Sequence, residues 1–421
     1  MASDAFDYGA SHNLAGHANL PSTRNIDSAH LVNYPALMAF IDNVSFSFNA
    51  QVEKTQFKKM DNIIVKNSLN SNDNSKEGDI DPNLNPNVIQ HSHLTIPLIP
   101  TFNNAIGISV SAPITEVSST ESGEPFLPYY LNYQENHFST LRVHYLQKIK
   151  NKFSFSLGQK SSFNVDGQTV LISRHQGDDD YSSAKMEMKA KPQSALIIGL
   201  GYLNDDKNFL LLFHYHDSLK TVLFNRMSGF TPLGDAQAKY NLDMSAQLRF
   251  DPRLYSLSFV KKNELLDFSL GLDYYDYSDF ESPKLKLTRN NGIIKGTKDY
   301  EDITIHHGIV PRLGLNLNNE SYQYKAGYFY QPRFIESNLN NNGNTIDTAS
   351  SNYTIGLARQ FRLLNWNFQT GISLLWKELE KLKVKKSSGM ENDQSGDKIG
   401  ANGYEISGSV QVITLGINWI F

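Results

Sequence analysis

The sequence contains no cysteine, which excludes thiol catalysis, thiolate metal sites and a disulfide framework. It also lacks any apolar run close to the roughly 18 residues that a transmembrane helix needs. The longest such runs lie at 195–203 and 209–213. Charged residues make up only 19% of the 421 residues, and a net charge of −4 gives no electrostatic basis for binding nucleic acid. These absences argue against a helical membrane protein and against a nucleic-acid-binding protein.

Aromatic residues, by contrast, make up 11% of the chain, which is too many for a disordered protein. From about residue 43 to the end, apolar residues alternate with small or polar ones at a period of two. This period is typical of β-strands with one apolar face. The clearest examples lie at 44–52, 266–274, 322–330, 366–376 and 413–421. The alternation therefore predicts an all-β protein.

The alternation predicts fourteen strands, joined by connections that are short and long in turn. The predicted strands are 43–57, 90–102, 105–118, 137–149, 153–165, 185–203, 208–224, 236–260, 265–282, 301–317, 321–332, 348–362, 365–381 and 403–421. Long connections such as 58–89, 166–184, 225–235 and 382–402 are expected to be irregular loops. Because long and short connections alternate strictly, the two ends of the sheet are expected to meet different surroundings.

This asymmetry favours a membrane barrel over a soluble sandwich. Sandwich strands usually have about 5–6 residues, whereas most of the predicted strands have 12–20. A bacterial outer-membrane barrel has tight periplasmic turns, long extracellular loops, an even number of strands and an apolar outer band. Only a closed sheet pairs every strand backbone group within lipid. The expected fold is a fourteen-stranded antiparallel transmembrane β-barrel, formed by residues 43–421.

The first 42 residues do not fit the barrel pattern, because they are small, polar and interrupted by glycine and proline. A segment that precedes the first strand begins on the periplasmic side, so we expect it to fold into the lumen as a plug. A mobile tail is the alternative. The start of the chain has neither the basic stretch nor the apolar core of a secretory signal. We therefore expect the mature form of a bacterial outer-membrane protein.

A series of short segments follows, in order and spacing, the pattern of a known family. The segments are Phe6, 14–18 (LAGHA), 34–40 (YPALMAF), 96–100 (IPLIP), 105–109 (AIGIS), 274–280 (YYDYSDF), 326–328 (AGY) and Phe421. Together they resemble the FadL-type outer-membrane transporters of long-chain fatty acids and other hydrophobic compounds. The resemblance covers nearly the whole chain. It implies a fourteen-stranded barrel that is plugged by its N-terminal segment, in agreement with the prediction from strand count.

The resemblance implies passive uptake of a hydrophobic ligand, such as a fatty acid or hydrocarbon, with lateral release through a kinked third strand. Gly107 and Pro113 lie on that predicted strand, where glycine often marks a bulge and proline cannot donate to the ladder. The alternative is that Gly107 only makes room for the plug. A fatty-acid pocket needs an apolar sleeve and a cation for the carboxylate. Phe6 and Lys284 match family positions near the pocket, and Lys160 is a second candidate cation.

Two further groups of residues follow from the resemblance. Tyr34, Pro35 and Ala36 correspond to the turn that closes the plug, although Tyr34 stands where the family has asparagine. Trp419 and Phe421 end the last strand and are expected to serve as an assembly signal for the barrel insertion machinery. The expected surroundings are outer-membrane lipids, and the expected state is a monomer.

The sequence offers no case for an enzyme, a cofactor or a metal site. It has no Gly-x-Ser-x-Gly elbow, phosphate-binding glycine loop or His-Glu-x-x-His motif. Histidine pairs occur at 91/93, 214/216 and 306/307, but none has a carboxylate at ligand spacing. A solvated acidic loop explains 178–180 better than a calcium site. An alternative function remains open: a FadL-like barrel that serves as a surface or secretion-partner protein without small-molecule cargo.

Overall fold

The computed structural model describes the chain with gaps. The described residues are 10–24, 26–67, 75–80, 86–98, 103–114, 118–119, 135–136, 139–163, 165–174, 181–233, 236–281, 286–290, 304–319, 321–335, 347–363, 366–384, 397–401 and 404–421. Among them, no helix is long and apolar enough to span a membrane.

Fourteen antiparallel strands form a closed barrel, as the alternation predicts. The strands are β1 (Ser45–Phe57), β4 (Asn87–Pro97), β5 (Asn104–Pro113), β8 (Thr140–Ile149), β9 (Phe153–Ser162), β12 (Ser194–Leu203), β13 (Phe209–His216), β16 (Arg253–Lys262), β17 (Leu266–Asp276), β19 (Gly308–Asn319), β20 (Tyr322–Gln331), β21 (Ser350–Leu363), β22 (Trp366–Val384) and β24 (Tyr404–Ile420). The first and last strands close the barrel, from Ser45 opposite Ile420 to Phe57 opposite Gly408. The predicted fourteen-stranded fold is confirmed.

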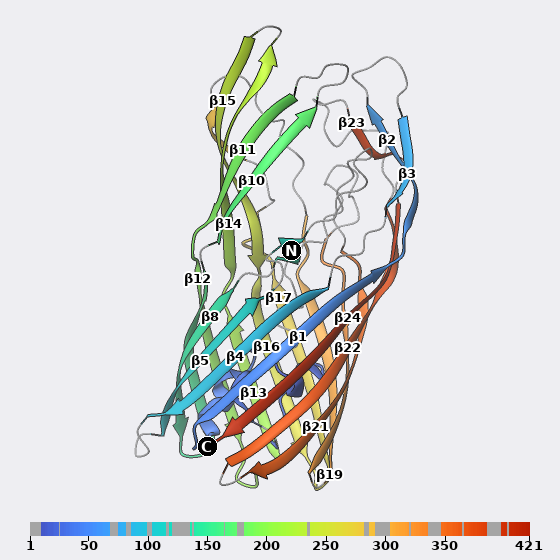
Figure 1. Cartoon of the computed structure of the whole chain (residues 1–421). Helices are drawn as coiled ribbons and strands as arrows, with labels where there is room; N and C mark the ends of the chain where they lie inside the picture. Colours follow the sequence, from blue (N-terminus) through green and yellow to red (C-terminus); the bar gives the residue numbers. More distant parts are fainter. Residues whose placement is uncertain are drawn as a thin grey trace.

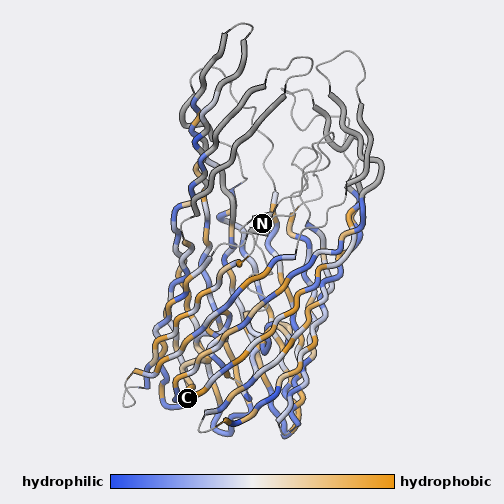
Figure 2. The backbone as a smooth tube through the Cα atoms, in the orientation of Figure 1, coloured by the Kyte–Doolittle hydropathy of each residue, from blue (hydrophilic) through white to orange (hydrophobic). Residues whose placement is uncertain are grey.

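Buried and exposed residues alternate along β1, and hydropathy alternates along the barrel strands (Figure 2). On β1, Ser47 and Asn49 are fully buried inside, whereas Phe48 between them is 37% exposed on the outside. Aromatic rings pair across neighbouring strands on the outer face: the ring centroids of Tyr328 and Tyr353 lie 5.4 Å apart, and those of Phe46 and Trp419 lie 5.2 Å apart. The outer face is therefore apolar and the inner face small or polar.

The two ends of the barrel differ. Connections such as 150–152, 204–208 and 263–265 are short, and they lie at the end where the C-terminus is found (Figure 1). We call this the short-connection end. The opposite end, the long-connection end, carries further strands that extend beyond the barrel (Figure 1).

The strands at the long-connection end correct part of the prediction. One sheet contains β10 (Val165–Arg174), β11 (Tyr181–Ala190), β14 (Leu219–Leu233), β15 (Ala236–Asp251) and β18 (Lys286–Asn290). A second contains β2 (Met60–Asn67), β3 (Ser75–Ile80) and β23 (Asp397–Ala401), and β6 (Ser118–Ser119) pairs with β7 (Glu135–Asn136). Much of 166–184 and 225–235 is thus strand, and the prediction of irregular loops there was wrong.

Three predicted strands are also each divided in two. Residues 185–203 break at Pro192, 208–224 at Asp217 and Ser218, and 236–260 at Pro252. Proline has no backbone N–H for the ladder, which explains two of the breaks. At the third, the Asp217 side chain accepts a hydrogen bond of 2.8 Å from the Ser218 backbone N–H and bends the chain. Each break separates a barrel strand from a strand of the outer sheet.

Residues 10–42, which we call the inner segment, pack inside the barrel toward the short-connection end (Figure 1). They form α2 (His12–Ala15) and two 3-10 helices, η1 (Ser28–Leu31) and η2 (Pro35–Phe40). Ser11 and Asp27 cap the first two by accepting hydrogen bonds from backbone N–H groups, and Pro35 begins the third. The division into a plug of residues 1–42 and a barrel of 43–421 stays a prediction.

Candidate functional site: the barrel lumen

Glycines on the barrel wall allow the inner segment to pack closely. A Cβ on Gly371 would lie 2.2 Å from the Cδ2 atom of His12, and one on Gly327 would lie 2.7 Å from the Cβ atom of Ala18. Other wall glycines in similar contact with the inner segment are Gly107, Gly199, Gly271, Gly314, Gly356 and Gly416. We call these eight residues the glycine seat. Because a side chain at any of these positions would collide with the inner segment, glycine there lets the inner segment pack against the wall near the short-connection end.

A buried carboxylate joins the parts of the inner segment to the wall. Asp27 is 2% exposed, and its Oδ2 atom accepts hydrogen bonds from the Nδ2 atoms of Asn13 (2.6 Å) and Asn418 (2.8 Å). Its Oδ1 atom accepts one of 2.9 Å from the Ala29 backbone N–H. Burial alone raises the pKa of Asp27, but hydrogen bonding and the charge of His30 outweigh it and hold this pKa below its ordinary value. Asp27 is therefore an ionised hub.

Other polar contacts fix the inner segment on further strands. The Arg24 Nε atom donates to Asp267 on β17 at 2.7 Å, and the Ser22 hydroxyl donates to the same carboxylate at 2.8 Å. On β20, Lys325 donates to the side-chain oxygen of Asn13. These contacts bring together residues from distant parts of the sequence. The local alternation of apolar and polar residues does not predict any of these contacts.

Two histidines of the inner segment are held neutral. Burial, reinforced by the charge of Lys325, lowers the pKa of His12 to about 4 and that of His17 to about 3. His12 Nδ1 lies 3.2 Å from the Asn49 side-chain oxygen, and His17 Nδ1 lies 3.2 Å from the Leu20 carbonyl oxygen. Charging either imidazole therefore requires solvation that the packed lumen does not provide.

Nearer the long-connection end, the lumen is lined by apolar side chains, which we call the lumen cluster. Its buried members are Phe57, Phe250, Tyr277, Val310, Phe329, Phe334, Leu375, Leu379, Val410 and Val412, with Ala18 of the inner segment beneath them. Aromatic rings contact one another through it, with centroids 5.2 Å apart for Tyr277 and Phe334 and 6.1 Å apart for Phe250 and Tyr277. An apolar lining inside a barrel is unusual, because the inward face of such barrels is typically polar.

Arg312 connects the lumen cluster to the inner segment. Its guanidinium lies 5.2 Å from the Phe329 ring centre, forms an ion pair with Asp273, and donates to the Ala18 carbonyl oxygen at 3.2 Å. Asp273 in turn accepts a 2.6 Å hydrogen bond from the Ser256 hydroxyl. The charge of Arg312 is therefore compensated within the wall, at the base of the lumen cluster.

The other half of the wall carries basic and imidazole side chains. They are His91 on β4, Arg142 and His144 on β8, Lys160 on β9, and His214 and His216 on β13, all at most 8% exposed. Lys160 Nζ lies 2.9 Å from the Oδ2 atom of Asp251. The lumen thus has one apolar and aromatic side and one basic side.

The structure places the predicted ligand-binding residues only in part. Lys160 points into the lumen, 1% exposed and paired with Asp251, so it lies on the basic side of the wall. Phe6 and Lys284 lie outside the described residues. The predicted YYDYSDF segment supplies Tyr275, Tyr277 and Phe280 to the lumen cluster or its edge. Phe329 and Phe334 also belong to the lumen cluster and were not predicted as site residues, although Phe329 has an inward place in the alternation.

The three predicted turn residues all contact the lumen interior. Tyr34 donates a 2.9 Å hydrogen bond to the Asn19 carbonyl oxygen and accepts one of 3.1 Å from the Ser258 hydroxyl. Pro35 opens η2, and the Cβ atom of Ala36 lies 3.2 Å from the place of a Cβ on Gly199. Tyr34 thus holds this turn against both the inner segment and β16 through its phenol hydroxyl.

Gly107 and Pro113 lie on β5, the third barrel strand. A Cβ on Gly107 would lie 2.2 Å from the Cδ2 atom of Leu31, so packing against the inner segment explains this glycine. Pairing of β5 runs without a register shift to β4, and to β8 as far as Ser111. Pro113 is the last paired residue, opposite Ile89. The lateral opening at this strand stays a prediction.

The last strand ends in the aromatic contacts of the outer face. Trp419 lies 5.2 Å from Phe46 and 6.1 Å from Phe368, and Phe421 lies 5.2 Å from Trp366, all between ring centroids. These residues form an aromatic belt at the short-connection end, where β1 and β24 close the barrel. Their role as an assembly signal stays a prediction.

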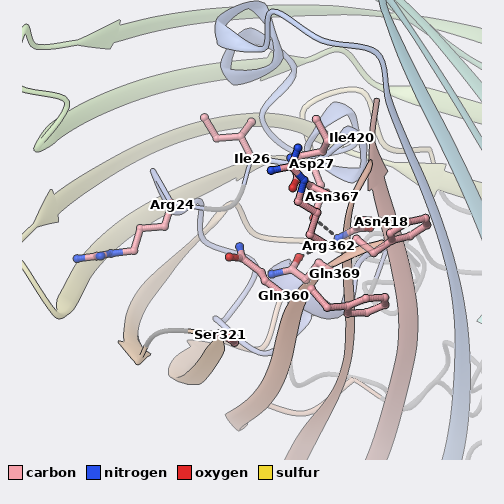
Figure 3. Close-up of a pocket in the computed structure, with 12 residues that line it drawn as sticks. Arg24, Ile26, Asp27, Ser321, Gln360, Arg362, Asn367, Gln369, Asn418 and Ile420 are labelled. Atoms are coloured by element: carbon pink, nitrogen blue, oxygen red, sulfur yellow. Dashed lines mark hydrogen bonds between the residues drawn. The ribbon is translucent and has the colours of Figure 1, made fainter. Parts of the chain in front are cut away.

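A cavity of about 470 Å³ lies at the short-connection end, between the inner segment and β21, β22 and β24 (Figure 3). Its lining residues are Arg24, Ile26, Asp27, Ser321, Gln360, Phe361, Arg362, Asn367, Phe368, Gln369, Asn418 and Ile420. Figure 3 shows Asp27, Gln369 and Asn418 joined by hydrogen bonds, while the Arg24 side chain extends away from them. Unlike the lumen cluster, this cavity is rich in polar side chains.

The described residues contain no group of three or more histidine, aspartate or glutamate side chains that could hold a metal ion. The paired histidines have other partners: His91 Nδ1 lies 2.9 Å from the Ser111 hydroxyl, and His93 Nδ1 lies 2.8 Å from the Ser109 hydroxyl. Their rings stack 6.2 Å apart and serve as polar links across the wall.

No protein-family model and no curated protein matches the sequence. Among solved structures, the fold is similar to that of a Pseudomonas aeruginosa FadL homologue, with a TM-score of 0.71 and 15% identity over 98% of this chain and 97% of that one. The P. putida toluene transporter TodX has a TM-score of 0.60 and 15% identity, over 99% of both chains. The CymD monoaromatic hydrocarbon channel has a TM-score of 0.57 and 11% identity, over 97% of this chain and 96% of that one. The chain thus has the FadL-type fold.

Proposed function

We propose that the protein is an outer-membrane channel for the passive uptake of hydrophobic small molecules, without chemical conversion of its cargo. The observation that carries the proposal is the lumen cluster, an apolar and aromatic lining inside a barrel whose outer face is also apolar. Such a lining solvates apolar cargo, whereas a polar lumen would pass water and ions. The shared fold with transporters of hydrophobic compounds supports the same function.

The proposed route runs from the long-connection end to the lumen cluster and then sideways through the wall. The inner segment acts as a plug, because the glycine seat and the Asp27 hub close the lumen below the cluster. The polar cavity beneath the plug does not favour an apolar molecule, which supports lateral release over exit at the short-connection end. We propose that the release site lies at β5, near Gly107 and Pro113.

The cargo is either a long-chain fatty acid or a neutral hydrocarbon. Phe6 and Lys284, with Lys160 as a second cation, are the proposed ligand-binding residues for an acid. The pairing of Lys160 with Asp251 and of Arg312 with Asp273 favours neutral cargo, because a carboxylate would have to displace an aspartate. The similar structures include a toluene transporter and a monoaromatic hydrocarbon channel.

A surface or secretion-partner protein without cargo is the second candidate function. The sheets at the long-connection end favour it, because they present strands well beyond the barrel (Figure 1). A stable co-purifying protein would support this alternative. The proposed partners of the channel are otherwise outer-membrane lipids and the barrel insertion machinery, and the proposed state is a monomer.

Mass spectrometry of the ligand that co-purifies with the detergent-extracted protein tests the proposal most simply. We expect a hydrophobic compound bound in the wild type, and less of it after Phe334→Ala, which removes a ring from the lumen cluster. Phe48→Ala, which removes a ring from the outer face, should leave the bound amount unchanged. Equal ligand in both variants, or none in the wild type, would contradict the proposed route.

A second measurement separates acid from neutral cargo. If the cargo is a fatty acid, Lys284→Ala should weaken binding of the acid several-fold and leave the matching alcohol almost unchanged. The tail supplies about 0.8 kcal/mol per buried CH₂, so the charge mainly orients the ligand. Phe6→Ala should weaken binding of both. If Lys284→Ala weakens binding of the acid and of the alcohol equally, Lys284 does not bind the carboxylate head group.

A further inference from the structure

We propose that the cavity at the short-connection end is a binding site for a small organic anion, with Arg362 as the residue that recognises its oxyanion. This site is distinct from the lumen cluster and does not depend on the identity of the cargo. A volume of about 470 Å³ falls within the range of small-molecule sites, about 300–1,000 Å³.

The Asp27 and Gln369 acceptors of the cavity are already satisfied. The Asp27 carboxylate accepts from Asn13, Asn418 and the Ala29 backbone. The Gln369 side-chain oxygen accepts from Asn13 at 2.5 Å and from Asn418 at 3.1 Å. A ligand that offers hydrogen-bond donors therefore finds few free partners here.

The two arginines of the cavity differ in whether their hydrogen-bond donors have partners. Arg24 is fully used, because it donates to Asp267 and to the carbonyl oxygens of Asn263 and Glu264. Arg362, by contrast, has no hydrogen-bond or ion-pair partner among the described residues, and neither does the side chain of Asn367. The two residues are cross-strand partners on β21 and β22, so their donors reach the cavity side by side.

The arrangement fits an oxyanion with a short apolar body. A guanidinium binds carboxylate or phosphate oxygens with two parallel hydrogen bonds, and a neighbouring amide N–H adds a third. Ile26 and Ile420 supply apolar surface in the same cavity. Of the two guanidinium groups in the lining, that of Arg24 is paired with Asp267, so Arg362 supplies the positive charge for a bound anion.

Binding of hexanoate, hexanol and inorganic phosphate to the detergent-solubilised full chain tests this site. We expect saturable binding of hexanoate to the wild type, weakened about tenfold in Arg362→Gln because a charged hydrogen-bond donor is lost. Arg359→Gln is the matched control, since Arg359 lies on the same strand but on the outer face, over the Tyr322 ring. Equal losses in the two variants, or equal binding of hexanol and hexanoate, would overturn the proposal.

The absence of cysteine permits a second measurement that reports the location directly. Hexanoate should slow the alkylation of Ser321→Cys, which lines the cavity, but not that of Asn319→Cys, which is exposed on the same turn. Equal protection of both positions, or of neither, would contradict the site. If phosphate protects Ser321→Cys as hexanoate does, the natural ligand is a free anion. If only hexanoate protects it, the ligand is an amphiphilic acid.

Discussion

The two halves of the lumen differ in what their inward residues do. Toward the short-connection end, the wall presents glycines and small polar residues, and the inner segment packs closely against the glycines. Toward the long-connection end, the wall presents large apolar rings on one side and Arg142 and Lys160 on the other, whereas His144 and His214 lie opposite Gly107 and Gly199 of the glycine seat. One barrel thus holds a segment of its own chain in its lower half and an apolar cluster in its upper half.

The difference shows how a uniform ladder of strands acquires two functions. Antiparallel pairing continues through both halves, with a register shift between Leu379 and Leu382 on β22, so side-chain size and polarity are the main difference between them. Arg312 stands at the boundary, in contact with Phe329 above and the Ala18 carbonyl below. The lower half is expected to give stability, and the upper half to give affinity for cargo.

Deletion of residues 2–42 is expected to have the largest effect, because it empties the lower half. A barrel of this strand number leaves a wide lumen when nothing fills it. Single-channel recording should then show a large, nonspecific conductance that the wild type lacks. An unchanged conductance would mean that the inner segment does not close the pore.

A bulky residue in the glycine seat is expected to have the second-largest effect. Gly327→Leu forces a side chain against Ala18 and is expected to lower the free energy of unfolding in detergent by about 3 kcal/mol. Ala326→Leu is the control, since Ala326 lies beside it on the lipid-facing side of β20. If both substitutions have the same small effect, close packing of the inner segment does not stabilise the fold.

Substitution of Asp27, in the same lower half of the lumen, is expected to have a smaller effect on the free energy of unfolding. Asp27→Asn confronts the donors of Asn13 and Asn418 with an amide and should lower the free energy of unfolding by about 2 kcal/mol. Asp42→Asn removes a carboxylate of an exposed ion pair with Lys148 and should cost less than about 1 kcal/mol. Urea unfolding of the two variants measures the difference, and equal values would argue against a hub.

Mild acid should also loosen the inner segment, and the contribution of each single histidine is the smallest of these effects. Because folding lowers the pKa of His12 from 6.5 to about 4, its contribution is complete above pH 6.5 and is lost as the pH falls toward 4. Between pH 7 and 5.5 the loss is about 1 kcal/mol for each such histidine. Protease cleavage within residues 10–42 should rise over this range in the wild type and rise less in His12→Gln. An equal rise in both would assign the effect to other groups.

The strands of the barrel could be predicted because their signal is local. Alternation at 266–274 or 322–330 identifies a strand and its outer face without knowledge of any partner. The outer strands were assigned to loops or merged with barrel strands, since the same alternation continues across Pro192 and Pro252. Where one sheet ends and another begins depends on pairing, which the sequence does not display.

The site was less predictable for the same physical reason. Alternation places Arg312 and Phe329 inside, but their contact depends on the register between β19 and β20. Likewise, Gly371 reads as a small strand residue, and only the position of His12 explains it. Lys160 was predicted as a ligand-binding cation, and this role stays a prediction; its pairing with Asp251 depends on the bend at Pro252, which the alternation does not show.

Uptake of radiolabelled toluene and oleate by cells that produce the protein tests the central claim most directly. The account predicts faster uptake of at least one compound than in cells without the protein. Leu375→Asp, which places a charge in the lumen cluster, should abolish the gain, and Gln56→Asp, on the outer face of β1, should preserve it. No gain with the wild type, or an equal gain with Leu375→Asp, would contradict the claim that hydrophobic cargo passes through the lumen cluster.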